Sequence, residues 1–66
     1  MKVEQGKWYL TRDKKSCVQV KKLLADEHGY VQEAVCSDKK KRNERGMIYR
    51  CSYHGNDLVK EIKVYA

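Results

Sequence analysis

The chain has 66 residues and contains no proline, no phenylalanine, four glycines and three cysteines. It shows no proline-rich linker, no low-complexity segment and no internal repeat, so nothing in it marks a domain boundary. Because a chain this short has no room for a second core, we expect one small basic domain over residues 1–66. A core of that size gives marginal stability, which leaves both a monomer and a homodimer open.

Long apolar runs are also absent. No stretch approaches the roughly 18 apolar residues that a membrane-spanning helix needs, and the opening residues MKVEQGKWYL lack the apolar segment of a signal peptide. We therefore expect a cytoplasmic protein without a membrane partner. Hydrophobic residues make up 41% of the chain, enough for a folded domain despite its 36% of charged residues.

The three cysteines, Cys17, Cys36 and Cys51, are odd in number and widely spaced. This pattern argues against a secreted disulfide framework and favours reduced thiols buried as small hydrophobic side chains. Cys51 and His54 form the only closely spaced pair that suits tetrahedral zinc, and no second pair completes a site. We expect no metal and no cofactor.

Known catalytic patterns are missing as well. The sequence has no glycine-rich phosphate loop, no H-E-x-x-H helix and no Gly-x-Ser-x-Gly elbow, and its nine acidic residues are scattered. A domain of this length also has little volume for a closed pocket of the usual size, about 300–1,000 Å³. We expect a binding protein rather than an enzyme.

Alternation of apolar and polar residues predicts three strands. The first covers residues 7–12 and is followed by a polar turn at 13–16. The second covers residues 47–54, with Met47, Tyr49, Cys51 and Tyr53 on one face. The third covers residues 58–65, after a turn at 55–57.

The middle of the chain fits two structures. A strand on which Val18, Val20 and Leu24 alternate could turn at His28 and Gly29 into a second strand at 30–36. Alternatively, Ser16 could begin a helix that ends near Gly29. The hairpin is favoured, which predicts an all-β small five-stranded barrel or curled antiparallel sheet. The alternative is an α+β fold with one helix near residues 16–28. We expect a single core that contains Trp8, Val20, Tyr49, Cys51 and Ile62.

Three short segments resemble a known kind of protein. They are Gly6 to Lys15, the Tyr-x-x-x-x-x-Gly stretch from Tyr49 to Gly55, and Asp57-Leu58-Val59-Lys60. Together they are similar to small phage-encoded proteins with an opening Y-x-T-R-D-G-R segment and a closing D-L-V segment. The chain departs from that pattern at Lys14, which replaces the turn glycine. The resemblance implies a compact β-rich fold and a phage origin, in a family with no agreed function and no catalytic residue.

The most informative feature is a basic stretch between two predicted strands. Residues 39–45 hold five of the 15 Lys and Arg residues of a chain whose formal net charge is +6, with a pI near 9.3. Such a stretch creates a positive potential that attracts phosphates or acidic protein surfaces. The simplest alternative is a solvated loop that keeps the protein soluble.

Two functions use this surface. In the first, the protein binds nucleic acid through backbone phosphates; in the second, it is a phage-type inhibitor or adaptor that binds an acidic surface of a host protein. We expect Tyr9 and Tyr30 to be exposed rings that could assist, because Trp8, Tyr49 and Tyr53 are needed to fill the core. The basic residues of the expected binding surface are Lys39, Lys40, Lys41, Arg42 and Arg45, supported by Lys14, Lys15, Lys21 and Lys22.

Overall fold

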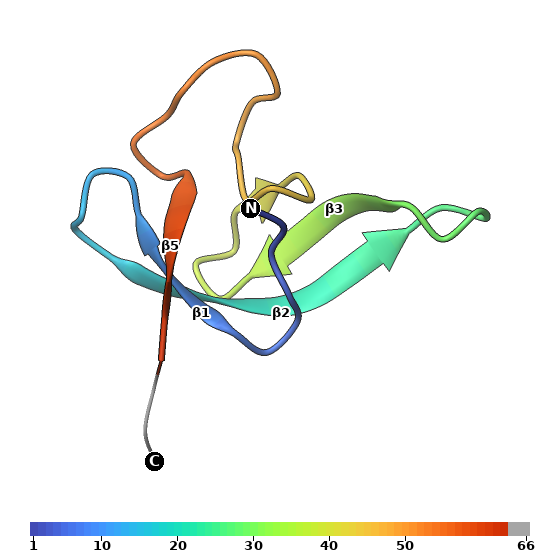
Figure 1. The fold of residues 1–66 in the computed structure, drawn as a ribbon, viewed down its shortest axis with the longest axis horizontal. Helices are drawn as coiled ribbons and strands as arrows, with labels where there is room; N and C mark the ends of the chain where they lie inside the picture. Colours follow the sequence, from blue (N-terminus) through green and yellow to red (C-terminus); the bar gives the residue numbers. More distant parts are fainter. Residues whose placement is uncertain (64–66) are drawn as a thin grey trace.

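Five strands form one antiparallel sheet in the computed structural model, which describes residues 1–63 (Figure 1). The strands lie in the sheet in the order β4-β3-β2-β1-β5. No pairing joins β4 to β5 within the described residues, so the sheet is curled and not closed into a barrel. This confirms the all-β prediction in its curled-sheet form. The bounds are β1 Trp8–Thr11, β2 Cys17–Ala25, β3 Val31–Cys36, β4 Lys41–Arg42 and β5 Leu58–Ile62.

The turn between β1 and β2 is fixed by polar side chains. Thr11 donates its hydroxyl to Asp13 Oδ1 at 2.6 Å, and the backbone N–H of Lys15 donates to the same oxygen at 3.0 Å. Lys14 has a φ of 62°, the left-handed conformation that glycine adopts without strain. Lys14 therefore occupies a left-handed turn position, at the place where the similar phage-encoded proteins have glycine.

The second hairpin joins β2 to β3 through a turn organised by Asp26. Its Oδ1 accepts the backbone N–H groups of His28 at 2.9 Å and Tyr30 at 3.0 Å, which is how an aspartate side chain commonly closes a turn. Gly29 supplies the positive φ of 85°. The hairpin prediction is confirmed, and the alternative helix near residues 16–28 is wrong because the segment forms β2.

The core lies on one face of the sheet, and the choice of face differs from the prediction. Val20 is buried as expected, but on β1 it is Tyr9 that points inward, only 1% exposed, while Trp8 is half-buried on the opposite face. Trp8 pairs there with Ile62, which is also half-buried. Tyr9 tolerates burial because its hydroxyl accepts the Glu4 backbone N–H at 2.8 Å. The predicted exposed ring of Tyr9 is thus a core residue.

The predicted strand at residues 47–54 is wrong, because this segment is an irregular loop. Asp57, 0% exposed, uses Oδ1 to accept the Ile48 N–H at 2.8 Å and Oδ2 to accept the His54 N–H at 2.9 Å. Arg12 donates to the same carboxylate at 3.2 Å. The loop backbone is therefore held by a carboxylate instead of a neighbouring strand. In Figure 1 this loop (orange) extends away from the sheet.

The exposed loop also moves two residues out of the predicted core. Tyr49 is 57% exposed and Cys51 is exposed, as is Cys17, so only Cys36 of the three cysteines is buried. No helix capable of crossing a membrane is present in residues 1–63. Residues 64 and 65, the end of the predicted last strand, lie outside the described residues.

Replacing the buried and an exposed cysteine by serine separates their roles. Cys36→Ser places a hydroxyl in the core and should lower the free energy of unfolding by about 1–3 kcal/mol. Cys51→Ser, on the exposed loop, should change it by less than about 0.5 kcal/mol. Urea unfolding followed by tryptophan fluorescence measures both. Equal losses in the two variants would contradict the placement of these thiols.

Asp57 should make stability depend on pH. Burial alone would raise the pKa of Asp57, but the donors from Ile48, His54 and Arg12 outweigh it and hold that pKa below its ordinary value. Because the folded carboxyl then has a lower pKa than the unfolded one, its contribution is complete above about pH 4 and is lost as the pH falls through the folded value.

Asp57→Asn should therefore lower the free energy of unfolding at pH 7 by about 1–3 kcal/mol, since an amide cannot accept all of these donors. The difference between wild type and variant should shrink below about pH 4. Urea unfolding at several pH values measures it. A constant difference from pH 7 to pH 3 would show that the charge of Asp57 is not what stabilises the loop.

Candidate functional site

The basic stretch at residues 39–45 is divided between solvent and core. Lys39 and Lys40 lie in the turn between β3 and β4, and Lys41 is exposed on β4. Asp38 accepts the backbone N–H of Lys40 at 3.0 Å, and Lys39 has a φ of 66°. The turn therefore presents three adjacent lysine side chains to solvent on a backbone that Asp38 orders.

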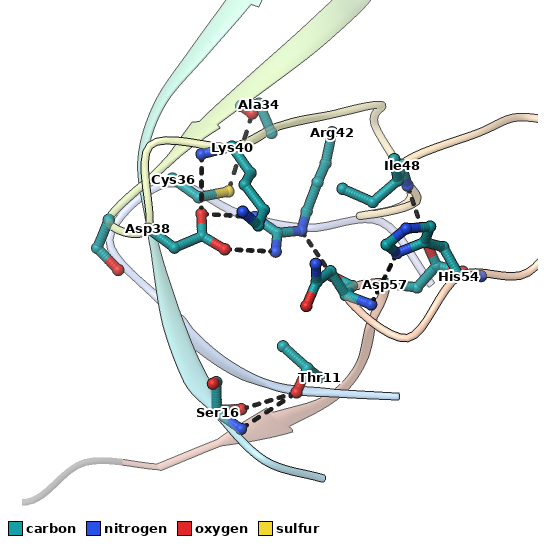
Figure 2. A network of polar contacts seen from close by, with 12 residues as sticks. Thr11, Ser16, Ala34, Cys36, Asp38, Lys40, Arg42, Ile48, His54 and Asp57 are labelled. Atoms are coloured by element: carbon teal, nitrogen blue, oxygen red, sulfur yellow. Dashed lines mark hydrogen bonds and ion pairs between the residues drawn. The ribbon is translucent and has the colours of Figure 1, made fainter. Parts of the chain in front are cut away.

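Arg42, by contrast, is a structural residue. Its guanidinium donates to both carboxylate oxygens of Asp38, at 3.0 and 2.7 Å, while Nε donates to the Asn56 carbonyl at 2.9 Å (Figure 2). The residue is 2% exposed. These bonds hold the pKa of Asp38 below its ordinary value against the effect of burial. Arg42 was expected on the binding surface and does not lie there; it connects β4 to the turn before β5.

Five exposed lysines lie together around β2, β3 and β4. Lys22 pairs with Val35 across the sheet and Val35 pairs with Lys41, so these two lysines share a row two strands apart, about 10 Å at the usual strand spacing. The pairing of β2 with β3 shifts register between Val20 and Lys22, which leaves Lys21 as an extra, exposed residue in β2. We call the group the lysine cluster; its members are Lys21, Lys22, Lys39, Lys40 and Lys41.

Lys14 and Lys15 are exposed in the turn between β1 and β2. This β1–β2 turn precedes the first residues of β2. Near the same end of β2, the Gln19 carbonyl accepts the backbone N–H of Ser37, which lies just before the β3–β4 turn. Figure 1 shows the β2–β3 turn at the opposite end of the molecule. These two lysines thus lie toward the same end of β2 as the β3–β4 turn.

A second group of cationic residues is associated with exposed tyrosines. Arg45 and Arg50 line one open hollow with Tyr30, which is 71% exposed, and another with Tyr53, which is 79% exposed. Arg12 lines the next hollow with Arg45 and Tyr53. We call this the arginine–tyrosine surface; its members are Arg12, Tyr30, Arg45, Arg50 and Tyr53.

Gly46 makes the position of Arg45 possible. It is buried with a φ of 80°, and an added Cβ would lie 2.8 Å from Leu58 Cβ and 2.9 Å from Val3 Cγ1. Its carbonyl accepts the Leu58 backbone N–H at 2.8 Å. The backbone at Gly46 packs closely against Leu58 and Val3 of the core, and the neighbouring Arg45 faces solvent.

The two groups form one continuous surface. Lys41 and Arg50 line a shared hollow beside β3 and β4, and Arg50 continues into the hollow of Arg45 and Tyr30. We call the lysine cluster and the arginine–tyrosine surface together the cationic band. The band runs from the exposed side of the sheet, past the short edge strand β4, to the long loop.

Few carboxylates oppose this band. Glu44 lies 3.3 Å from Arg50, and Glu33 lies 3.9 Å from Lys41. The buried Asp57 lies 3.2 Å from Arg12. The other four members of the lysine cluster have no carboxylate at ion-pair distance among residues 1–63, and neither does Arg45. Exposed ion pairs are weak, so most of these positive charges are available to an anionic partner.

The described residues hold no cluster of three or more metal-ligating His, Cys, Asp or Glu side chains. His54 Nδ1 accepts the Asn56 backbone N–H at 3.0 Å, which uses one of its two ring nitrogens within the loop. Burial raises the pKa of the Cys36 thiol, which favours the protonated, unreactive form.

Sequence reasoning found the lysines and Tyr30 but missed Arg12, Arg50 and Tyr53. Tyr53 was assigned to the core because it alternated with Met47 and Cys51, and Arg12 and Arg50 are isolated cations in the sequence. The only local signal was that residues 45–53 contain two arginines and two tyrosines. Arg50 and Tyr30 line one hollow although they are far apart in the sequence, and such long-range proximity leaves no local signal.

Comparison with known proteins adds no relative. No protein-family model, no curated protein and no solved structure matches this chain. The resemblance to small phage-encoded proteins, and the phage origin that it implies, therefore stay predictions.

Proposed function

We propose that this protein is a non-enzymatic nucleic-acid-binding protein that contacts backbone phosphates, largely without regard to sequence. The observation that supports it best is the continuity of the cationic band, in which Lys41, Arg50 and Arg45 connect the lysine cluster to two exposed tyrosines. Phosphate contacts of this kind release condensed counterions and need no base-specific geometry.

The character of the cations fits this function. Lysine is a flexible point charge, suited to a phosphate backbone whose exact path varies, whereas arginine also stacks on flat rings. In this chain the lysine cluster lies on the sheet and the β3–β4 turn, and the exposed Arg45 and Arg50 line hollows with tyrosines. The net charge of +6 adds long-range attraction toward any polyanion.

Docking on an acidic host-protein surface is the competing function, and it would use the same charges. An exposed sheet edge could then supply an anchor by strand addition. Edge strand β5 carries Lys60 and Glu61, both exposed, and charged residues on an edge strand oppose such pairing. The structure therefore favours the phosphate partner.

Removing two charges from the lysine cluster should flatten the salt dependence of binding. In Lys40→Gln/Lys41→Gln, each lost phosphate contact should reduce the slope of log affinity against log salt by about 0.9 on duplex DNA, or about 0.7 on a single strand. Fluorescence anisotropy with labelled oligonucleotides from about 50 to 300 mM salt measures the slope.

The matched control is Lys60→Gln/Lys63→Gln, which removes the same charge from β5 and the residue after it. Its slope should stay close to that of the wild type. If wild-type protein binds neither single-stranded nor duplex nucleic acid at about 50 mM salt, where electrostatic contacts are strong, the proposed function is wrong and protein docking takes its place. Equal effects of both variants would show a diffuse charge effect with no defined surface.

A further inference from the structure

Tyr53 is unusually exposed for a side chain that is held in place. It is 79% exposed, yet the guanidinium of Arg12 lies over its ring, 4.2 Å from the ring centroid. The same guanidinium donates to Asp57 through Nε at 3.3 Å and Nη2 at 3.2 Å, and Asp57 is 0% exposed. A buried carboxylate thus fixes an arginine, and the arginine supports an exposed ring.

This support leaves one face of the ring open. Arg12 covers one side, and the large exposed fraction means that the other side is in contact with solvent. An exposed side chain ordinarily exchanges between rotamers on a picosecond-to-nanosecond timescale. The stacked guanidinium reduces that freedom, so a flat ligand that stacks on Tyr53 loses less entropy on binding.

A second exposed ring, Tyr30, shares a hollow with Arg45. Tyr30 and Arg45 line one hollow, while Tyr53 and Arg45 line the next. Tyr30 is 71% exposed and immediately precedes β3, on a turn whose backbone is bonded to Asp26. Two tyrosines on ordered backbone therefore flank one cation that has no carboxylate at ion-pair distance among residues 1–63.

Taken together with the proposed function, on which it rests, the geometry points to single-stranded nucleic acid as the ligand, with bases stacked on Tyr53 and Tyr30 and the intervening phosphate at Arg45. A base in a duplex is already stacked between its neighbours, whereas an unpaired base offers its free face to an aromatic side chain. Phosphate contacts alone bind both forms; the two tyrosines distinguish them.

The stacking contribution can be separated from the phosphate contribution because it involves no counterion release. Tyr53→Leu should weaken binding to a fluorescein-labelled oligothymidylate by about five-fold to 150-fold, the range that loss of one base–aromatic stack produces. The slope against log salt should not change. Binding to a labelled duplex of the same length should stay as in the wild type.

Two further variants are matched controls. Tyr53→Phe keeps the ring and should bind the single strand as the wild type does. Tyr49→Leu makes the same substitution in the same loop, at a ring that packs edge-on against His54 with centroids 5.7 Å apart, and it should leave affinity unchanged. Circular dichroism melting curves check that each variant is folded, which the exposure of both rings predicts.

These outcomes distinguish failure of the stacking site from failure of the proposed function. A selective loss of single-strand affinity in Tyr53→Leu, restored by phenylalanine, supports the stacking site. Equal wild-type affinity for both forms, or equal losses in Tyr53→Leu and Tyr49→Leu, would overturn it while phosphate binding stands. Absence of binding to either form at about 50 mM salt, by contrast, overturns the proposed function and the stacking site with it.

Discussion

The buried carboxylate of Asp57 is the interaction on which the arrangement of the surface depends. It accepts hydrogen bonds from Ile48, His54 and Arg12, and so attaches the long loop to the end of β1 and to the start of β5. A carboxylate in the interior is costly unless several donors satisfy it, and here three donors converge on it. The same contact fixes the guanidinium that supports Tyr53, so loop stability and the geometry of the exposed ring have one origin.

A second buried polar contact does similar work on the opposite edge of the sheet. Arg42 is surrounded by basic neighbours in sequence, yet it faces inward and binds Asp38 with both terminal nitrogens and Asn56 with Nε. A short strand such as β4 has few ladder bonds to hold it, so the buried pair supplies contacts that its backbone cannot. Asp38 also orders the turn that presents Lys39 and Lys40. In this small domain, the buried Arg42 and the buried Asp57 each help to position cations that face solvent.

In the proposed function, charge and aromatic surface act on different parts of one ligand. The lysines of the sheet offer mobile charges, which tolerate variation in the path of a phosphate backbone. The tyrosines near Arg45 offer flat faces, which act on bases only when these are unpaired. A band built from both kinds of residue gives an affinity with two independent components, one that depends on salt and one that does not. This division is what makes the proposed function experimentally separable into its parts.

Sequence by itself determined the all-β class, the β2–β3 hairpin and the lysines of the cationic band, because turn residues such as Asp26 and Gly29 and runs of lysine act locally. Tertiary structure decided which face of β1 is buried. Trp8 and Tyr9 are adjacent aromatic residues on opposite faces of β1, and a shift by one residue exchanges the faces. The core that buries Tyr9 includes Ala34 and Leu58, which are distant from it in the sequence. Tertiary structure also decided that residues 47–54 form a loop. Their alternating apolar residues are typical of a strand, but Asp57 accepts the backbone N–H groups of Ile48 and His54. The contact between Tyr53 and Arg12 could not be predicted from the sequence, since the two residues are 41 positions apart. Asp57 holds the Arg12 guanidinium where it lies over the ring.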